Sequence, residues 1–418
     1  MGVGKQRDVA HARERLPREI WVLVGASFLI AVGYGLVAPT LPAFVRSFDV
    51  GITAASLVIS VFALSRLVFA PLSGRIVARF GELPGYLVGL CVVAVTTGAC
   101  AFATEYWQLL ALRGLGGIGS TMFTVSALSL LLRLAPVRMR GRASGMWATG
   151  FLLGNIIGPI VGGVLSVISM RAPFLVYGAV LLLVVALGWL MLRNRTTETA
   201  AEISAAGPPA RFVVALGHPA YRAALAASFA NGWAVFGVRI ALVPLLVVEA
   251  LGEPAAWAGF ALAVFAAGNA ATLIIAGPLA DRRGRRPPAL VGLAVSALAT
   301  GVLGFVGDPV LFLVVSLVAG LGSGLINPPM NAVVADVIGS KARGGTVLAG
   351  FQMAGDLGSI LGPVLAGVLA ETVGFGAAFA ICGMVLLVAL VTWVLAPETL
   401  PGHVPTAAVE AACPAGSG

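Results

Sequence analysis

The sequence predicts an all-α membrane protein in which twelve transmembrane helices form two pseudo-symmetric six-helix bundles. Three observations lead to this fold class. Of the 418 residues, 59% are hydrophobic and only 10% are charged, whereas a soluble domain carries about 25% charged residues. Twelve apolar runs are long enough to cross a bilayer. The second half of the chain also repeats motifs of the first half at a nearly constant offset.

Each apolar run has about 18 or more residues, and a helix of about 20 residues crosses the hydrocarbon core at 1.5 Å per residue. None of the runs alternates apolar and polar residues as a membrane barrel requires. The predicted spans are residues 20–43, 52–73, 85–103, 107–132, 144–168, 172–192, 223–248, 256–280, 288–307, 310–335, 345–369 and 374–396.

Lysine and arginine are distributed asymmetrically between the loops. Most of the 26 basic residues fall in the N-terminal segment and in alternate loops, such as Arg75 and Arg79 or the run 282–286. Because basic loops stay in the cytoplasm, we expect a multi-pass protein of the cell membrane with both termini cytoplasmic. The net charge of +9 then results from the basic residues that hold these loops in the cytoplasm. The basic residues are spread over six segments, so we expect no nucleic-acid binding.

The predicted domain boundaries follow the apolar pattern. Residues 1–19 are charged and precede a first span without a small-residue cleavage site, which predicts a cytoplasmic N-terminal segment and no cleaved signal peptide. A polar stretch at 194–220 is predicted to be a cytoplasmic linker between the six-helix halves 20–193 and 221–396. The Pro- and Ala-rich residues 397–418 are predicted to form a disordered cytoplasmic tail.

The two halves repeat each other in sequence. The loop Gly74-Arg-Ile-Val-Ala-Arg-Phe-Gly81 aligns with Gly277-Pro-Leu-Ala-Asp-Arg-Arg-Gly284 at an offset of about 203 residues. The Leu-Val-Gly-Leu sequences that follow, at 87–90 and 290–293, align at the same offset. Parallel six-helix repeats occur in one class of transporters, which bind their substrate between the repeats near the middle of the membrane.

A glycine-rich run lies inside the fifth predicted span. Glycine and proline disfavour a helix interior by about 1 and 3 kcal/mol relative to alanine. The spacing i, i+4 and i+8 places the first three glycines on one bare strip that lets a neighbouring helix approach closely, and the proline favours a bend. The run contains Gly154, Gly158, Pro159, Gly162 and Gly163, and the eleventh span repeats it with Gly358, Gly362 and Pro363.

With these motifs the chain resembles a twelve-helix member of the major facilitator superfamily over residues 20–396. The signature Gly-x-Leu-Ala-Asp-Arg-x-Gly-Arg-Arg of that family stands intact at 277–286, and its fourth-helix pattern stands at 113–117. The run 154–163 is similar to the fifth-helix motif of its twelve-span drug/proton antiporters. The resemblance implies that both glycine runs and the signature residues Gly277, Asp281, Arg282, Gly284 and Arg285 take part in gating.

The first copy of the loop signature departs from the family pattern. Ala78 stands where the family carries an aspartate that helps to latch the cytoplasmic side, and Glu82 and Leu83 stand where basic residues are expected. Three interpretations are open. The intact second copy takes over the latch with Asp281 and Arg285, or Glu82 substitutes for the missing aspartate. Alternatively, the loop has drifted and its arginines serve topology alone.

Asp356 and Arg113 are the first candidates for a mechanism, because an ionisable residue inside a span is costly and its default interpretation is functional. Asp356 lies midway along the eleventh span, two residues from Gly358. Two residues rotate a helix by about 200°, so Asp356 should face away from the glycine strip and into a central cavity, where it could take up protons. The alternative is a fixed ion pair or a hydrogen bond to a neighbouring helix. By resemblance, Arg113 would tune proton movement or contact the substrate.

Three further polar residues in spans are candidates for a substrate cavity. Arg66 in the second span and Arg239 in the seventh either line the cavity or extend their charges toward an interface. Asn231 lies about two turns before Arg239 and is a candidate ligand, although interhelical hydrogen bonding is the commoner role of such groups. If all three arginines face inward with one acid, the interior is net positive, which favours neutral or anionic amphiphiles over lipophilic cations.

These observations predict a secondary active transporter that exports a small amphiphilic molecule, a drug or natural product, by proton-coupled alternating access. A metabolite importer or facilitator of the same superfamily is the alternative. We expect no enzyme activity and no metal or other cofactor, because the 3 histidines and 4 cysteines show no catalytic or metal-ligand spacing. The proton gradient would be the driving force. The expected partners are the substrate and the lipid bilayer, and we expect a monomer.

Overall fold

The chain folds into long apolar helices in a computed structural model that describes residues 17–135, 139–192, 212–338 and 345–400. Within these residues, twelve helical spans are long and apolar enough to cross a membrane. Their bounds agree with the predicted spans to within a few residues at each end. The predicted all-helical fold class is therefore confirmed.

The N-terminal half has seven helices but six spans, because the short helix α2 continues the span that begins with α1. Every loop between these spans is short, so consecutive spans run antiparallel. The helices are α1 (Arg18–Val37), α2 (Leu41–Arg46), α3 (Ile52–Phe80), α4 (Glu82–Cys100), α5 (Tyr106–Leu134), α6 (Arg140–Ile168) and α7 (Ala172–Leu192).

The C-terminal half contributes the other six spans and differs in its seventh. Two π-helical segments interrupt that span, in a stretch that holds Gly232, Gly237 and Pro244. The elements are α8 (Phe212–Gly217), α9 (Pro219–Asn231), η3 (Gly232–Val238), α10 (Arg239–Leu245), η4 (Leu246–Ala250), α11 (Ala255–Arg283), α12 (Arg286–Leu303), α13 (Pro309–Ile338), α14 (Gly345–Thr372) and α15 (Phe375–Leu395).

The predicted glycine strip of the fifth span is a helix contact. A Cβ atom on Gly154, Gly158 or Gly162 would overlap backbone atoms of α1, and Pro159 packs on Gly35 of the same helix. Close backbone approach is the physical reason for small residues at such a contact. The sequence prediction that a neighbouring helix lies on this strip is confirmed, and that neighbour is α1.

The C-terminal half repeats this contact between α14 and the seventh span. Gly358 and Gly362 lie against α9 and η3, and Pro363 packs on Gly237. The pairs Pro159–Gly35 and Pro363–Gly237 are equivalent in the repeat. Both halves therefore use the same small residues to bring their fifth helix onto their first.

Two contacts join the halves to each other. Gly163 of α6 approaches Ala256 and Gly259 of α11, and Gly367 of α14 approaches Thr53 and Ser56 of α3. These contacts are also equivalent in the repeat. The interface between the halves thus rests on α6 with α11 and on α3 with α14.

Polar contacts close one end of this interface. The Arg46 guanidinium pairs with Glu249 at 2.8 Å, and the Thr53 hydroxyl donates to the Glu371 carboxylate at 2.6 Å. Deeper along the same helices, the Ser60 hydroxyl donates to the Ile360 carbonyl at 2.7 Å. All three contacts lie toward the loops that follow the first, seventh and eleventh spans.

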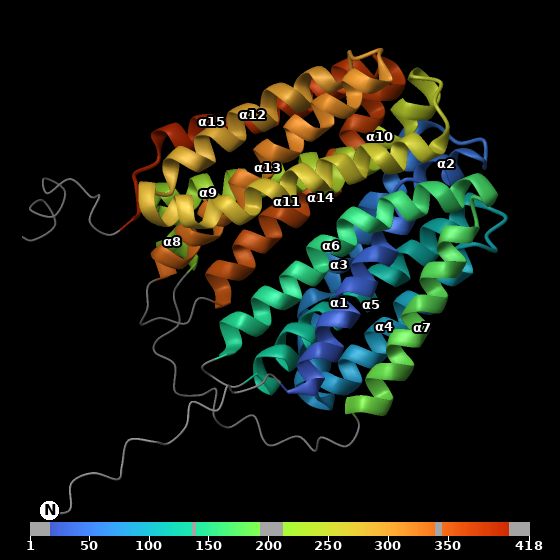
Figure 1. The fold of residues 1–418 in the computed structure, drawn as a ribbon, viewed down its shortest axis with the longest axis horizontal. Helices are drawn as coiled ribbons and strands as arrows, with labels where there is room; N and C mark the ends of the chain where they lie inside the picture. The colour runs from blue at the N-terminus through green and yellow to red at the C-terminus, as the bar shows by residue number, and fades with distance from the viewer. Residues whose placement is uncertain (1–16, 136–138, 193–211, 339–344, 401–418) are drawn as a thin grey trace, which may run out of the picture.

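The two bundles converge near α2 and α10 and separate toward the end where α8 lies (Figure 1). The open end belongs to the loops that carry the repeated signature, since α3 and α11 run from the closed end to Phe80 and Arg283. Polar contacts thus join the bundles at one end, here called the closed end, and the bundles diverge toward the basic loops, here called the open end (Figure 1).

Two predicted boundaries need correction. Residues assigned to the linker up to 220 include α8 and the start of α9, and Phe212 of α8 packs edge-on against Tyr221 at 6.3 Å between ring centroids. Residues 397–400, assigned to a disordered tail, contact the loop before α12 through Glu398. Residues 1–16, 193–211 and 401–418, where most of the predicted N-terminal segment, linker and tail fall, lie outside the described residues.

Candidate functional site

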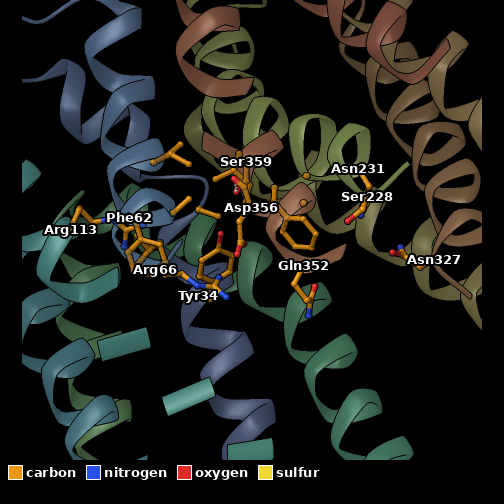
Figure 2. Close-up of a pocket in the computed structure, with 18 of the residues that line it drawn as sticks. Tyr34, Phe62, Arg66, Arg113, Ser228, Asn231, Asn327, Gln352, Asp356 and Ser359 are labelled. Carbon is orange, nitrogen blue, oxygen red and sulfur yellow. Dashed lines mark hydrogen bonds between the residues drawn. The ribbon is translucent and has the colours of Figure 1, made fainter. Parts of the chain in front are cut away.

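A cavity of about 380 Å³ lies between the halves. Its walls come from α1, α3, α5 and α7 on one side and from the seventh span, α13 and α14 on the other. Figure 2 shows Arg66 and Tyr34 from the N-terminal half facing Asp356 from the C-terminal half. The volume falls within the range of about 300–1,000 Å³ that small-molecule sites occupy.

Asp356 lines this cavity from α14, as the helical-wheel argument predicts. Gly358, two residues on, lies instead against the seventh span. Among the described residues no cation lies within 4 Å of the Asp356 carboxylate, so the predicted alternative of a fixed ion pair does not apply to this conformation. Arg66 is the charged group that acts on Asp356 across the cavity. The carboxylate is therefore accessible to a proton or a substrate.

Two arginines of the N-terminal half line the same cavity. Arg66 comes from α3 and Arg113 from α5, and the Arg113 guanidinium lies over the Phe62 ring at 4.3 Å from its centroid. The Nε atoms of both arginines are buried without a hydrogen-bond partner among the described residues. Of the two predicted alternatives for Arg66, the structure favours the cavity over an interfacial position.

Tyr34 is a cavity residue that the sequence did not single out. It lies in α1 between Gly33, which packs on the Tyr177 ring, and Gly35, which packs on α6. Because both neighbours occupy helix contacts, Tyr34 points the other way and lines the cavity. A large polar aromatic residue between two glycines inside a span is the signal that could have identified it.

A second cavity of about 300 Å³ adjoins the first and shares Tyr34, Asn231 and Asn327 with it. It extends between α6 and α11, and its lining is mostly apolar and aromatic. Arg239 lines it from the start of α10 and is only 3% exposed. Its guanidinium lies 3.8 Å from the centroid of the Phe265 ring. The structure thus favours the cavity interpretation of Arg239 and separates this arginine from Arg66, Arg113 and Asp356.

Asn231 lines both cavities and also takes part in interhelical hydrogen bonding. The Asn269 amide donates to the Ser323 hydroxyl at 3.1 Å, and that hydroxyl donates to the Asn231 side-chain oxygen at 3.4 Å. The chain of bonds joins α11, α13 and α9. Both roles weighed for Asn231 are therefore compatible with its position.

Two of the predicted gating residues around the start of α12, Asp281 and Arg285, belong to a cluster at the open end of the C-terminal half. The Arg285 guanidinium pairs with Asp281 and, at 3.2 Å, with Asp336 at the end of α13. Gly284 has a φ of +97°, a conformation that favours glycine. Arg282 is exposed, and Gly277 has open space where a side chain would lie.

Residues after α15 complete this cluster. The Glu398 carboxylate accepts from the backbone N–H groups of Arg285 and Arg286 at 2.8 and 3.0 Å, and the Thr399 hydroxyl donates to Asp336 at 2.8 Å. Partial burial by itself would raise the pKa of Glu398. The backbone donors of Arg286, Arg285, Leu400 and Thr399 outweigh burial and lower that pKa below its ordinary value.

In the first copy of the loop, Glu82 forms an ion pair with Arg133 of α5. Gly81 repeats the positive φ of Gly284, at +94°. Arg75 and Arg79 are exposed. Three interpretations of the departure from the signature were open. The ion pair gives Glu82 a structural role, which speaks against the interpretation that the loop has drifted and its arginines serve topology alone.

Comparisons with known proteins place these features in a family. A family model described as Major Facilitator Superfamily matches residues 23–257 and 224–413. The multi-drug resistance efflux pump PmrA of Streptococcus pneumoniae is 25% identical over 363 residues, which cover 84% of this chain and 89% of the pump. The class C tetracycline resistance protein of Escherichia coli is 28% identical over 326 residues, covering 75% of this chain and 81% of that protein.

The fold is also similar to that of a solved transporter. A bacterial homologue of the human lysosomal transporter Spinster, in an inward-facing and unoccupied conformation, matches with a TM-score of 0.71 at 17% identity. The match covers 90% of this chain and 94% of that one. At this identity the likeness concerns the fold alone.

Proposed function

The chain belongs to the major facilitator superfamily of secondary transporters, and from this premise we propose that it exports a small amphiphilic molecule, a drug or natural product, in exchange for protons by alternating access. It is a multi-pass membrane protein and not an enzyme. The names of its relatives, an efflux pump and a tetracycline resistance protein, support export. The function needs no cofactor besides the proton gradient and is compatible with a monomer.

One observation carries the proposal. The Asp356 carboxylate faces the cavity between the halves, and the charged group that acts on it, Arg66, belongs to the opposite half. Rocking of the halves about the α6–α11 and α3–α14 contacts changes the separation of these two groups. An acid whose neighbouring charge moves away and returns can bind a proton on one side of the membrane and release it on the other.

The orientation follows from the loops. Because the open end carries the basic loops, the positive-inside rule supports its assignment as the cytoplasmic end, and the bundles would then diverge toward the cytoplasm. An exporter collects its cargo in this conformation. The glycine contacts of α6 and α14 and the Arg285 cluster would act as the gating elements.

The test is uptake into inside-out membrane vesicles with an imposed pH gradient, using tetracycline and the hits of a susceptibility screen as probes. Asp356→Asn should abolish accumulation against a gradient while substrate counterflow without a gradient persists. Asp49→Asn is the matched control, because Asp49 is exposed in an outer loop and its φ of +57° suits asparagine. Undiminished accumulation by the Asp356→Asn protein would remove this carboxylate from the mechanism. Uptake in the opposite sense would favour an importer.

A further inference from the structure

The second cavity holds a buried cation that forms no ion pair among the described residues. Arg239 is 3% exposed, and its Nε and Nη1 atoms have no hydrogen-bond partner among the described residues. None of the residues that line this cavity is acidic. A buried charge without a partner is costly, so the site is electrostatically incomplete without an anion.

The guanidinium is fixed in a defined position at the wall of the cavity. The Cζ atom of the guanidinium lies over the Phe265 ring, 3.8 Å from its centroid. The Nε and Nη1 atoms are covered, so the cavity reaches the guanidinium at Nη2, where a carboxylate can accept a charge-assisted hydrogen bond. A carboxylate therefore fits the geometry and supplies the missing charge.

The rest of the cavity suits a flat apolar body. Trp147 and Phe151 of α6 stack with ring centroids 5.9 Å apart and planes 15° apart. Tyr34 and Phe236 line the same cavity, and the side chains of Asn155 and Asn269 add polar groups to its lining. Aromatic rings offer offset-stacked contacts to another aromatic system.

We propose that this cavity is a distinct anion subsite, in which Arg239 binds the carboxylate of an aromatic amphiphile whose ring system packs against Trp147 and Phe151. The subsite is contiguous with the Asp356 cavity but uses a different cation from Arg66 and Arg113. Cargo and proton are thus bound by separate charges. That the bound molecule is exported rests on the proposed function, whereas its binding does not.

The test uses three fluorescent probes with one aromatic body, namely 1-pyrenebutyrate, its methyl ester and the trimethylammonium analogue of the same chain length. Binding to the purified full-length protein is read by energy transfer from tryptophan to pyrene, without any gradient. The anionic probe should bind about ten- to hundredfold more tightly than the ester, as expected for hydrogen bonds to a charged group, and the cationic probe most weakly.

Variants assign this preference to one residue. Arg239→Gln should remove the preference for the anion, and Arg239→Lys should retain part of it because the charge remains. Arg171→Gln is the control, since Arg171 is exposed on an outer loop, and it should bind like the wild type. A preference that persists in Arg239→Gln and disappears in Arg66→Gln would overturn the proposal, as would equal binding of the ester.

A measurement on the unaltered protein covers the case that Arg239→Gln does not fold. A photoreactive diazirine derivative of pyrenebutyrate should label peptides of α6 and α11, and labelling confined to α3 and α14 would overturn the proposal. The two proposals fail separately. Binding as described without export that depends on Asp356 would refute the function alone, whereas export of only the cationic probe would refute the anion subsite alone.

Discussion

Glu82 and Arg133 form an ion pair at the open end of the N-terminal half, and Arg285 and Asp336 form one at the open end of the C-terminal half. The two pairs occupy equivalent positions, because the offset of 203 that aligns the loops also maps Glu82 onto Arg285 and Arg133 onto Asp336. Only the signs are exchanged. The repeat therefore preserves an opposite-charge contact between the loop and the fourth helix of each half, and not the identity of the residue that carries each charge.

The helix contacts behave differently from the charges. The α6–α1 and α14–α9 contacts keep glycine at two equivalent positions, Gly154 with Gly358 and Gly158 with Gly362, whereas Gly162 aligns with Ala366. Two opposite charges can trade places and still attract, whereas a close backbone contact requires small residues on both partners. This difference indicates which parts of the repeat can diverge and which cannot.

The largest expected effect tests the shared packing. Gly154→Ala and Gly358→Ala should each lower the free energy of unfolding by about 1–3 kcal/mol, because the added Cβ overlaps the carbonyl of Phe28 or Phe229. Thermal unfolding of the purified variants measures this.

The repeat also provides matched controls for this test. Gly74→Ala and Gly277→Ala place the same methyl group where nothing lies within 4 Å. These variants should be neutral or stabilised by about 0.5–1 kcal/mol, since alanine suits a helix better than glycine. If Gly358→Ala proved as stable as Gly277→Ala, the packing would not be common to the two halves.

A smaller effect tests the exchanged charges. Glu82→Arg alone should destabilise the protein by about 1–2 kcal/mol, because it places two partly buried arginines together. Adding Arg133→Glu gives the N-terminal half the polarity of the C-terminal half and should restore most of the loss. A double-mutant cycle of unfolding free energies measures the coupling. Zero coupling would mean that the two pairs resemble each other by position only.

The smallest effect tests the part of the C-terminal cluster that follows α15. Glu398→Gln should cost about 0.5–1.5 kcal/mol, because a neutral acceptor replaces the carboxylate that binds the Arg285 and Arg286 amides. Hydrogen exchange of these amides, compared with that of amides inside α12, is the measurement. Unchanged protection in Glu398→Gln would show that the contact contributes nothing measurable.

The same contact has a pH dependence of known sign. Since the pKa of Glu398 is lowered from the ordinary value of 4.5, the stabilisation is fully present above that value and is lost as the pH falls through the lowered pKa. Exchange at the two amides, corrected for its intrinsic pH dependence, should therefore accelerate only in acid. Loss of protection near neutral pH would contradict this assignment.

Much of this architecture could be predicted from the sequence. Long apolar runs specify spans, and the fixed rotation per residue places Asp356 opposite the glycine strip without any tertiary information. Arg66 and Arg239 were left between two interpretations, because one sequence does not record which helix packs beside them. The Glu82–Arg133 pair joins residues 51 positions apart, and only the repeat alignment relates it to Arg285 and Asp336.

The aromatic residues of the cavities could not be predicted in this way. Lipid tails are as apolar as leucine, so a phenylalanine that faces the bilayer and one that faces an apolar cavity occupy similar environments. Phe62 and Phe265 are identified as cavity residues by the arginines that lie over their rings. Those contacts depend on the packing of neighbouring spans.

The separation of Arg239 from Asp356 has an electrical consequence. If the proposed exchange takes one proton inward on Asp356 and one carboxylate outward from Arg239, each cycle would move two elementary charges in the direction that an inside-negative potential favours. Each charge corresponds to about 2.3 kcal/mol per 100 mV, so the voltage contributes about 4.6 kcal/mol per 100 mV to every cycle. A neutral cargo would draw on half of that amount. Such a transporter would still work when the pH difference across the membrane vanishes.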